Sequence, residues 1–192
     1  MAFVGLKYVV AAPITETEAS GSTAASVSYA DGFVVGKAIT ANINVTVGNV
    51  KLYGDDTVAE VDNAFSEGTL EFGVTKMTND IQTKLLGHTE GTSTAAGEIT
   101  AKSSDVPPYN GIGFYAPKLD DHVRKYRAIW LTKTVASEPS ENFTTRQGQT
   151  AFGTPTISVT LMEDITGAWK IEKTFDTEAA AITWLNGKAG IA

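Results

Sequence analysis

The chain has 192 residues and no cysteine, and its 15 Lys and Arg against 22 Asp and Glu give a formal net charge of −7. This length fits one domain that buries most of its apolar surface, and the missing cysteines exclude disulfides, thiolate metal sites and cysteine nucleophiles. The acidic balance argues against a protein that grips nucleic acid, because Lys and Arg supply most of that affinity, and no apolar run approaches the roughly 18 residues of a membrane helix.

The N-terminal part of the chain predicts one strand followed by a polar arm. Residues 3–10 are apolar and rich in residue types that favour strands, and no signal peptide is expected from them. Residues 16–28 are rich in Thr, Ser, Ala and Gly, and this composition favours a loop or a mobile arm. We therefore expect an N-terminal arm over residues 1–30, followed by a turn at Asp31-Gly32.

The clearest pattern is a strict alternation that starts at residue 39. Its apolar positions are Ile39, Ala41, Ile43, Val45 and Val47, and its polar positions are Thr40, Asn42, Asn44 and Thr46. A period of two is typical of a strand with one buried face. Gly48-Asn49 offers a tight reversal, and the alternation resumes through Val50, Lys51, Leu52 and Tyr53. The sequence therefore predicts a hairpin over residues 39–53.

Residues 68–105 predict a strand, a short helix and a long loop. The strand covers residues 68–75, and its buried positions are Leu70, Phe72 and Val74. A short helix follows, because Ile81 and Leu85 are four residues apart and Gly87 ends the pattern. Residues 88–105 are rich in Thr, Ser, Gly and Ala, so we expect a mobile loop there.

The second half predicts four further strands and a helix. The strands cover residues 111–116, 123–135, 156–162 and 168–175. The helix begins at Asp176 or Thr177, has Glu178 in its first turn and ends near Asn186-Gly187. Its apolar positions, which we expect to pack on the sheet, are Ala179, Ile182 and Leu185, broadened by Trp184.

These elements predict a single domain of mostly β, α+β class. We expect two packed antiparallel β-sheets, arranged as a sandwich or split barrel, with the C-terminal helix on the flank and the short helix as a second one.

No catalytic or metal site is expected. His88 falls in a loop and His122 in a turn, and neither has the spacing of a metal-binding pair. Two pairs of adjacent acids also fall in turns, where solvated carboxylates are the expected structure, namely Asp55-Asp56 and Asp120-Asp121. The chain is therefore not expected to be an enzyme.

No cofactor site is expected either. Gly111-Ile112-Gly113 lacks the third glycine and the following helix of a dinucleotide site, and favours a strand that a neighbouring backbone approaches closely. Residues 124–130 mix basic and aromatic side chains, as a platform for single-stranded nucleic acid would. Alternation places Tyr126 and Trp130 on one face, however, and this favours ordinary core packing.

An ordered series of segments carries a resemblance along nearly the whole chain: FVGLKY at 3–8, GKAI at 36–39, VKLYGDD at 50–56, PYNGIGFY at 108–115, RKYRAIWL at 124–131, FGTP at 152–155, and WK through FDTEA to WL over 169–185. Together they resemble the major tail proteins, or tail tube proteins, of long-tailed phages and prophages of Gram-positive bacteria. No single segment is diagnostic, and residues 16–28 and 88–105 carry no such match.

The resemblance implies a structural virion protein without a catalytic site. Such proteins have two packed sheets with a flanking helix, and they form hexameric rings in which strands of all subunits complete one β-barrel. The rings stack into a hollow tail that holds the tape measure protein and later conducts DNA. The implied partners are further copies of the chain, the tape measure protein, and the tail terminator and distal tail or baseplate proteins. The implied location is the virion, after assembly in the host cytoplasm.

The predicted hairpin suits such an assembly, because unpaired strand edges invite pairing with another chain. We expect inter-subunit contacts at Ile39, Ile43, Val45, Val47, Val50, Leu52 and Tyr53. An acidic chain also suits a conduit through which DNA slides without specific binding. The alternative is an immunoglobulin-like or carbohydrate-binding sandwich of a virion or cell surface, with Tyr109, Tyr115 and Trp169 as an exposed aromatic platform.

Overall fold

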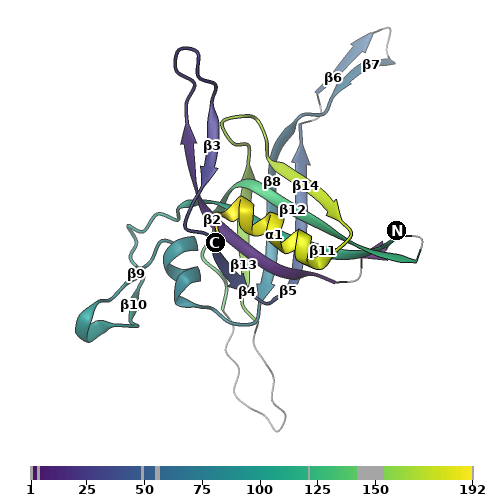
Figure 1. Cartoon of the computed structure of the whole chain (residues 1–192). Helices are drawn as coiled ribbons and strands as arrows, with labels where there is room; N and C mark the ends of the chain where they lie inside the picture. Colours follow the sequence, from purple (N-terminus) through teal and green to yellow (C-terminus); the bar gives the residue numbers. More distant parts are fainter. Residues whose placement is uncertain are drawn as a thin grey trace.

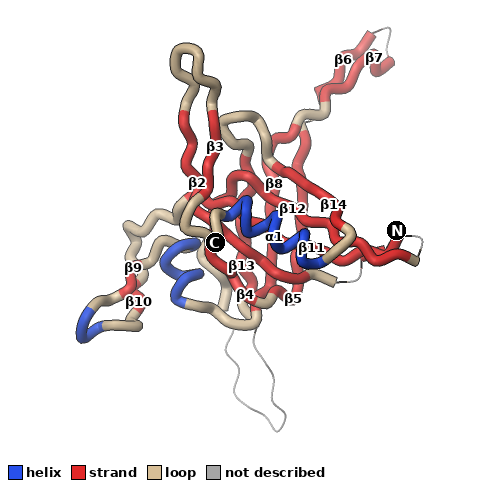
Figure 2. Tube along the Cα trace, in the orientation of Figure 1, coloured by secondary structure: helices blue, strands red, loops and turns tan. Residues whose placement is uncertain are grey.

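The computed structural model of the chain describes residues 2–3, 5–48, 50–54, 57–120, 122–141 and 154–191. Over these residues the fold is mostly antiparallel β with one α-helix (Figures 1 and 2). The strands are β1 Ala2–Phe3, β2 Lys7–Thr17, β3 Ser26–Tyr29, β4 Phe33–Gly36, β5 Ala38–Val47, β6 Val50–Gly54, β7 Thr57–Asp62, β8 Phe65–Val74, β9 Thr89–Glu90, β10 Ile99–Thr100, β11 Tyr109–Asp120, β12 Val123–Ala136, β13 Thr156–Met162 and β14 Lys170–Phe175. The helical elements are η1 Ile81–Leu85, η2 Ser93–Ala95 and α1 Glu178–Ala189.

Ten strands form one continuous sheet instead of two separate ones. Its main path runs β3-β2-β11-β12-β13-β8-β5, and β1, β4 and β14 pair beside it with β11, β2 and β12. The long strand β12 joins the two parts, because residues 126–131 pair with β14 and residues 133–136 pair with β13. Among the described strands this path has two ends, β3 and β5, so the sheet does not close into a barrel within one chain.

Two apolar clusters hold the fold together. The larger cluster joins side chains of β2, β4, β11 and β12 to side chains of β8 and β13, and the predicted buried positions Leu70, Phe72 and Val74 belong to it. The smaller cluster lies under α1, which packs on β2, β11, β12 and β14. In Figure 1 the helix crosses one face of these strands. Alternation along β12 explains both clusters, because Ala128 and Trp130 face the helix while Ile129 and Leu131 face the larger core.

The C-terminal helix confirms the predicted start and corrects the predicted end. The Thr177 side chain accepts a hydrogen bond from the Ala180 backbone N–H at 3.3 Å, as an N-cap does. The helix continues through Asn186-Gly187 and is capped by Gly190 in the left-handed conformation. Its fully buried positions are Ala181, Leu185 and Ala189, with Ile182 and Trp184 half-buried against the same cluster. Ala179 is exposed, so the buried face is rotated from the predicted one.

The predicted hairpin over residues 39–53 is wrong in its pairing. Strand β5 pairs with β8, and β6 pairs instead with β7. The Gly48 backbone N–H donates to the carbonyl of Ala64 at 2.8 Å, so the β6–β7 ribbon continues the β5–β8 ladder outward (Figure 1). The reversal therefore lies beyond Gly54 instead of at Gly48-Asn49, and Asn49, Asp55 and Asp56 fall outside the described residues.

Two segments expected as loops contain hairpins. In the predicted N-terminal arm, β2 extends to Thr17 and pairs with β3, and an isolated bridge joins Ser20 to Thr23. In residues 88–105, the short strands β9 and β10 pair around the η2 turn. Both hairpins project from the body in Figure 1. The predicted second helix is reduced to the π-helical turn η1, whose Ile81 and Leu85 are buried as expected.

The missing side chain of Gly113 makes room for the Trp130 and Leu185 side chains, and not for a neighbouring backbone as the sequence predicts. A Cβ built on Gly113 would lie 2.5 Å from Trp130 Cε3 and 2.8 Å from Leu185 Cδ2, and one on Gly111 would lie 2.5 Å from Trp130 Cζ2. The Trp130 indole therefore lies across both glycines of the neighbouring strand. We expect Gly113→Ala to lower the free energy of unfolding by about 1 to 3 kcal/mol, because an overpacked core must shift its side chains or backbone. Urea unfolding measures this loss, and unchanged stability would contradict the packing.

Candidate functional site

Strand β5 is the candidate assembly site, because it is an unpaired sheet edge that carries exposed apolar side chains. Among the described strands β5 pairs only with β8, which leaves its other edge without a partner strand. Ala41 and Ile43, opposite Phe72 and Leu70, pack partly against the larger core. Farther along the same face, Val45 and Val47 are 40% and 51% exposed. The apolar face of β5 thus extends beyond the core that one chain provides.

The structure separates the predicted assembly residues into two groups. Ile39, Ile43, Val45 and Val47 lie together on β5, and Ile39 is 49% exposed. Val50, Leu52 and Tyr53 lie on β6 in the β6–β7 ribbon, and their side chains fall outside the described part of the structure. The described pairing of this ribbon extends to Gly54 and Thr57.

The opposite face of β5 is polar and continues onto β8. Asn42, Asn44 and Thr46 are exposed, and their cross-strand partners are Glu71, Thr69 and Glu67, which are exposed as well. These six side chains include two carboxylates and no cation. Such a surface is suited to contact with water and does not attract a polyanion.

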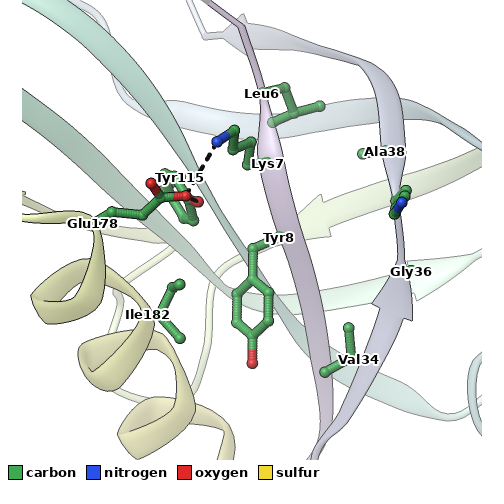
Figure 3. A pocket seen from close by; sticks show the side chains of 10 residues that line it. Leu6, Lys7, Tyr8, Val34, Gly36, Ala38, Tyr115, Glu178 and Ile182 are labelled. Carbon is green, nitrogen blue, oxygen red and sulfur yellow. Dashed lines mark hydrogen bonds and ion pairs between the residues drawn. The ribbon is translucent and has the colours of Figure 1, made fainter.

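A groove between α1 and the β4–β5 link was not predicted from the sequence. Its volume is about 540 Å³, and its apolar lining comes from Leu6, Val34, Ala38 and Ile182, together with the Tyr8 ring (Figure 3). Tyr8 has a φ of 57° and its hydroxyl donates to Asn186 Oδ1 at 2.7 Å. At one end Lys7 Nζ lies 3.2 Å from Glu178 Oε1, to which the Tyr115 hydroxyl also donates.

These contacts change the acidity of both groups at the end of the groove. The hydrogen bond from Tyr115, and then that from Lys7, holds the pKa of Glu178 below its usual value. Burial, and then the hydrogen bond to Glu178, raises the pKa of Tyr115.

The lowered pKa of Glu178 predicts a contribution to acid stability. A carboxyl group whose pKa is lower in the folded state stabilises the fold above its unfolded pKa, and this contribution is lost as the pH falls through the folded pKa. We expect Glu178→Gln to unfold more readily than wild type at neutral pH, with the difference shrinking as the pH falls below about 4. Urea midpoints over a pH series measure this, and a constant difference at all pH values would contradict it.

The structure does not bring Tyr109, Tyr115 and Trp169 together as the exposed aromatic platform expected for a carbohydrate-binding sandwich. Tyr115 is buried, with 1% of its surface exposed. One face of Trp169 is covered by Phe65, with ring centroids 4.6 Å apart, and Lys170 Nζ lies 4.9 Å from the Trp169 ring. Tyr109 is exposed, and Lys133 Nζ lies 4.9 Å from its ring. Only one of the three predicted platform residues therefore has a largely accessible side chain.

The two histidines lie far from each other in the chain and have different surroundings. His122 is exposed in the turn between β11 and β12, next to Asp121, which falls outside the described residues. His88 is enclosed between the carboxylates of Asp105 and Glu138.

No group of three or more His, Asp and Glu side chains able to hold a metal ion occurs among the described residues. Nor is any helix in that part of the chain long and apolar enough to cross a membrane.

Comparison with known proteins gives no assignment. No protein-family model matches the chain, and no curated protein matches it.

Proposed function

We propose that this chain is the subunit of a phage tail tube, in which hexameric rings stack into a hollow structural tail. The observation that carries the proposal is the free edge of β5, which has no partner among the described strands and where Ile39, Val45 and Val47 are exposed. The ordered sequence resemblance to tail tube proteins supports the same conclusion.

An unpaired apolar edge is a hazard in a protein that acts alone, because it is a template for pairing with another chain. The described part of the chain leaves Val45 and Val47 in contact with water, and an adjacent copy that packs on β5 would cover them. Two different surfaces of adjacent copies meet in a ring, and closure of the ring leaves no free edge. The end strands β3 and β5 of the open sheet suit this role.

The projecting hairpins suit the contact between stacked rings. The β2–β3 and β6–β7 ribbons and the β9–β10 hairpin extend from the body in different directions (Figure 1). A subunit without such extensions could form a ring but would have little surface with which to reach the next one. In the assembled tail, the other partners are the tape measure protein and the tail terminator and distal tail or baseplate proteins.

The polar face of β5 and β8 suits a water-filled lumen. Its Asn, Thr and Glu side chains present no cation to DNA, and the whole chain carries a formal charge of −7. A basic lumen would retain DNA through release of counterions, whereas this face lets DNA pass without specific binding. In this proposal the tube acts in the virion, after assembly in the host cytoplasm.

Sedimentation velocity over a concentration series, followed by negative-stain microscopy, tests the proposal. We expect a species of six times the 20.3 kDa chain mass, and rings or tubes of uniform bore at high concentration. A strictly monomeric species, even with the tape measure and distal tail or baseplate proteins present, would overturn the proposal.

A further inference from the structure

The arm of residues 88–105 is closed at its base by the side chains of its first and last residues. His88 Nδ1 lies 3.1 Å from Asp105 Oδ2. The two chain segments also approach closely next to this contact, because a Cβ on Gly87 would lie 2.6 Å from the Val106 carbonyl oxygen. His88 therefore sits where the arm leaves the body and where it returns.

The other ring nitrogen of His88 reaches a different segment. Nε2 lies 3.2 Å from Glu138 Oε2, in the connection that follows β12. The side chains of His88 and Asp105 are 8% and 13% exposed, whereas that of Glu138 is 69% exposed. One imidazole ring thus joins the base of the arm to the start of the β12–β13 connection.

Each ring nitrogen of His88 faces a carboxylate, and this arrangement depends on the protonation state of the ring. A neutral imidazole has one N–H donor and one lone pair, whereas the imidazolium has two donors. Only the imidazolium can donate to both Asp105 and Glu138. In the neutral ring, one nitrogen lone pair would face a carboxylate oxygen, and that contact would be repulsive.

We propose that His88 is a proton-dependent clip, which in its charged form fixes the base of the 88–105 arm to Glu138, just after β12, and in its neutral form releases it from Glu138. The clip operates within one chain, so it does not depend on whether the chain assembles into a tube.

The charges around the ring favour this arrangement. Asp105 and Glu138 are the charged groups that contact the ring, and the Lys102 backbone N–H donates to Asp105 Oδ2 at 2.9 Å. This bond, and then the one with His88, lowers the pKa of Asp105. Glu90, two residues into the arm, is bound by Asn79 Nδ2 at 2.9 Å. Asp105 is therefore held as the ionised acceptor that the clip requires.

Hydrogen exchange by NMR on the monomeric fraction of the full chain tests the clip. Protection factors, which correct for the intrinsic effect of pH on exchange, are measured for residues 89–104 from about pH 5 to about pH 9, while the histidine ring signals are titrated in parallel. We expect arm protection to fall roughly two- to fivefold with the same midpoint as the His88 ring, because the contact that is lost is an ion pair with an exposed carboxylate. The midpoint of this fall should differ from the midpoint of the His122 ring signals, which serve as the internal control.

Glu138→Gln provides the decisive variant. A Gln amide can donate to a neutral Nε2 while Nδ1–H donates to Asp105, so arm protection should become independent of pH and remain high. Glu138 is exposed, so this change should leave the fold intact. Arm protection that does not change across the His88 titration in wild type, or that falls equally in wild type and Glu138→Gln, would overturn the proposal.

Discussion

Replacing Val45 and Val47 together with aspartate should give a folded chain that no longer assembles. Both side chains are about half exposed on β5, an edge strand of the described sheet, so in the isolated chain the double variant should lose only about 1 kcal/mol of stability. In the proposed ring the same carboxylates would be buried against an adjacent copy without a partner charge, which is strongly unfavourable. Negative-stain microscopy should show no rings or tubes.

Thr46→Asp is the matched control for this experiment. Thr46 lies between the two valines on the same strand, but on the polar face, where its cross-strand partner is Glu67. We expect this variant to assemble, because a carboxylate there faces water. Normal tubes from the double aspartate variant would show that β5 is not an assembly surface. Loss of assembly in both variants would show that the polar face is also a protein contact.

Trp130→Ala should cause the largest loss of stability in the body of the protein. The Trp130 side chain is fully buried, meets the edge of Tyr29 with ring centroids 5.0 Å apart and lies across Gly111 and Gly113. Removing a buried Trp side chain and leaving a cavity costs about 3 to 5 kcal/mol. Urea unfolding should show this loss, and a smaller loss is expected for Trp130→Phe, which keeps an aromatic ring in the site.

A double variant separates the Trp130 contact from general damage. Gly113→Ala should cost less in the Trp130→Ala background than in wild type, because the atom that the new methyl group would strike is absent. Equal costs in both backgrounds would mean that the indole does not lie over Gly113. Residual overpacking against Leu185 should remain in either case.

The period of the apolar residues was sufficient to predict where some elements lie and which of their faces is buried. Strand β13 has the predicted bounds, and in β12 the alternation correctly separated Trp130 from Ile129. The N-cap of α1 was also predicted, because a cap depends on residues that are adjacent in the chain. The sequence predicts an end near Asn186-Gly187, but the helix continues to Ala189, because a glycine inside a helix is tolerated at a modest cost.

Strand partners could not be predicted in the same way. The period of two shows which face of β5 is buried, but it does not show whether β6 or β8 lies beside it. Gly48-Asn49 resembled a tight turn, whereas the chain runs on outward into β6. The same limit applies to residues 16–28 and 88–105, where a composition typical of loops occurs in hairpins held mainly by backbone hydrogen bonds.

The candidate site on β5 could be predicted only in part, because alternation shows which residues share a face but not which other elements cover them. Alternation identified Ile43, Val45 and Val47 as one apolar face, but only the three-dimensional structure shows that the core covers Ile43 more than the two valines. The His88 clip had no signal in the sequence, because Asp105 and Glu138 are distant along the chain from the ring that they enclose. The groove beside α1 likewise depends on contacts between elements far apart in the chain.

The most direct test is electron cryomicroscopy of the concentrated protein, with β5 traced in the resulting map. The proposed function predicts stacked hexameric rings of uniform bore in which an adjacent copy covers Val45 and Val47. A protein that remains monomeric with the tape measure and distal tail or baseplate proteins, or an assembly in which β5 stays exposed to solvent, would contradict it.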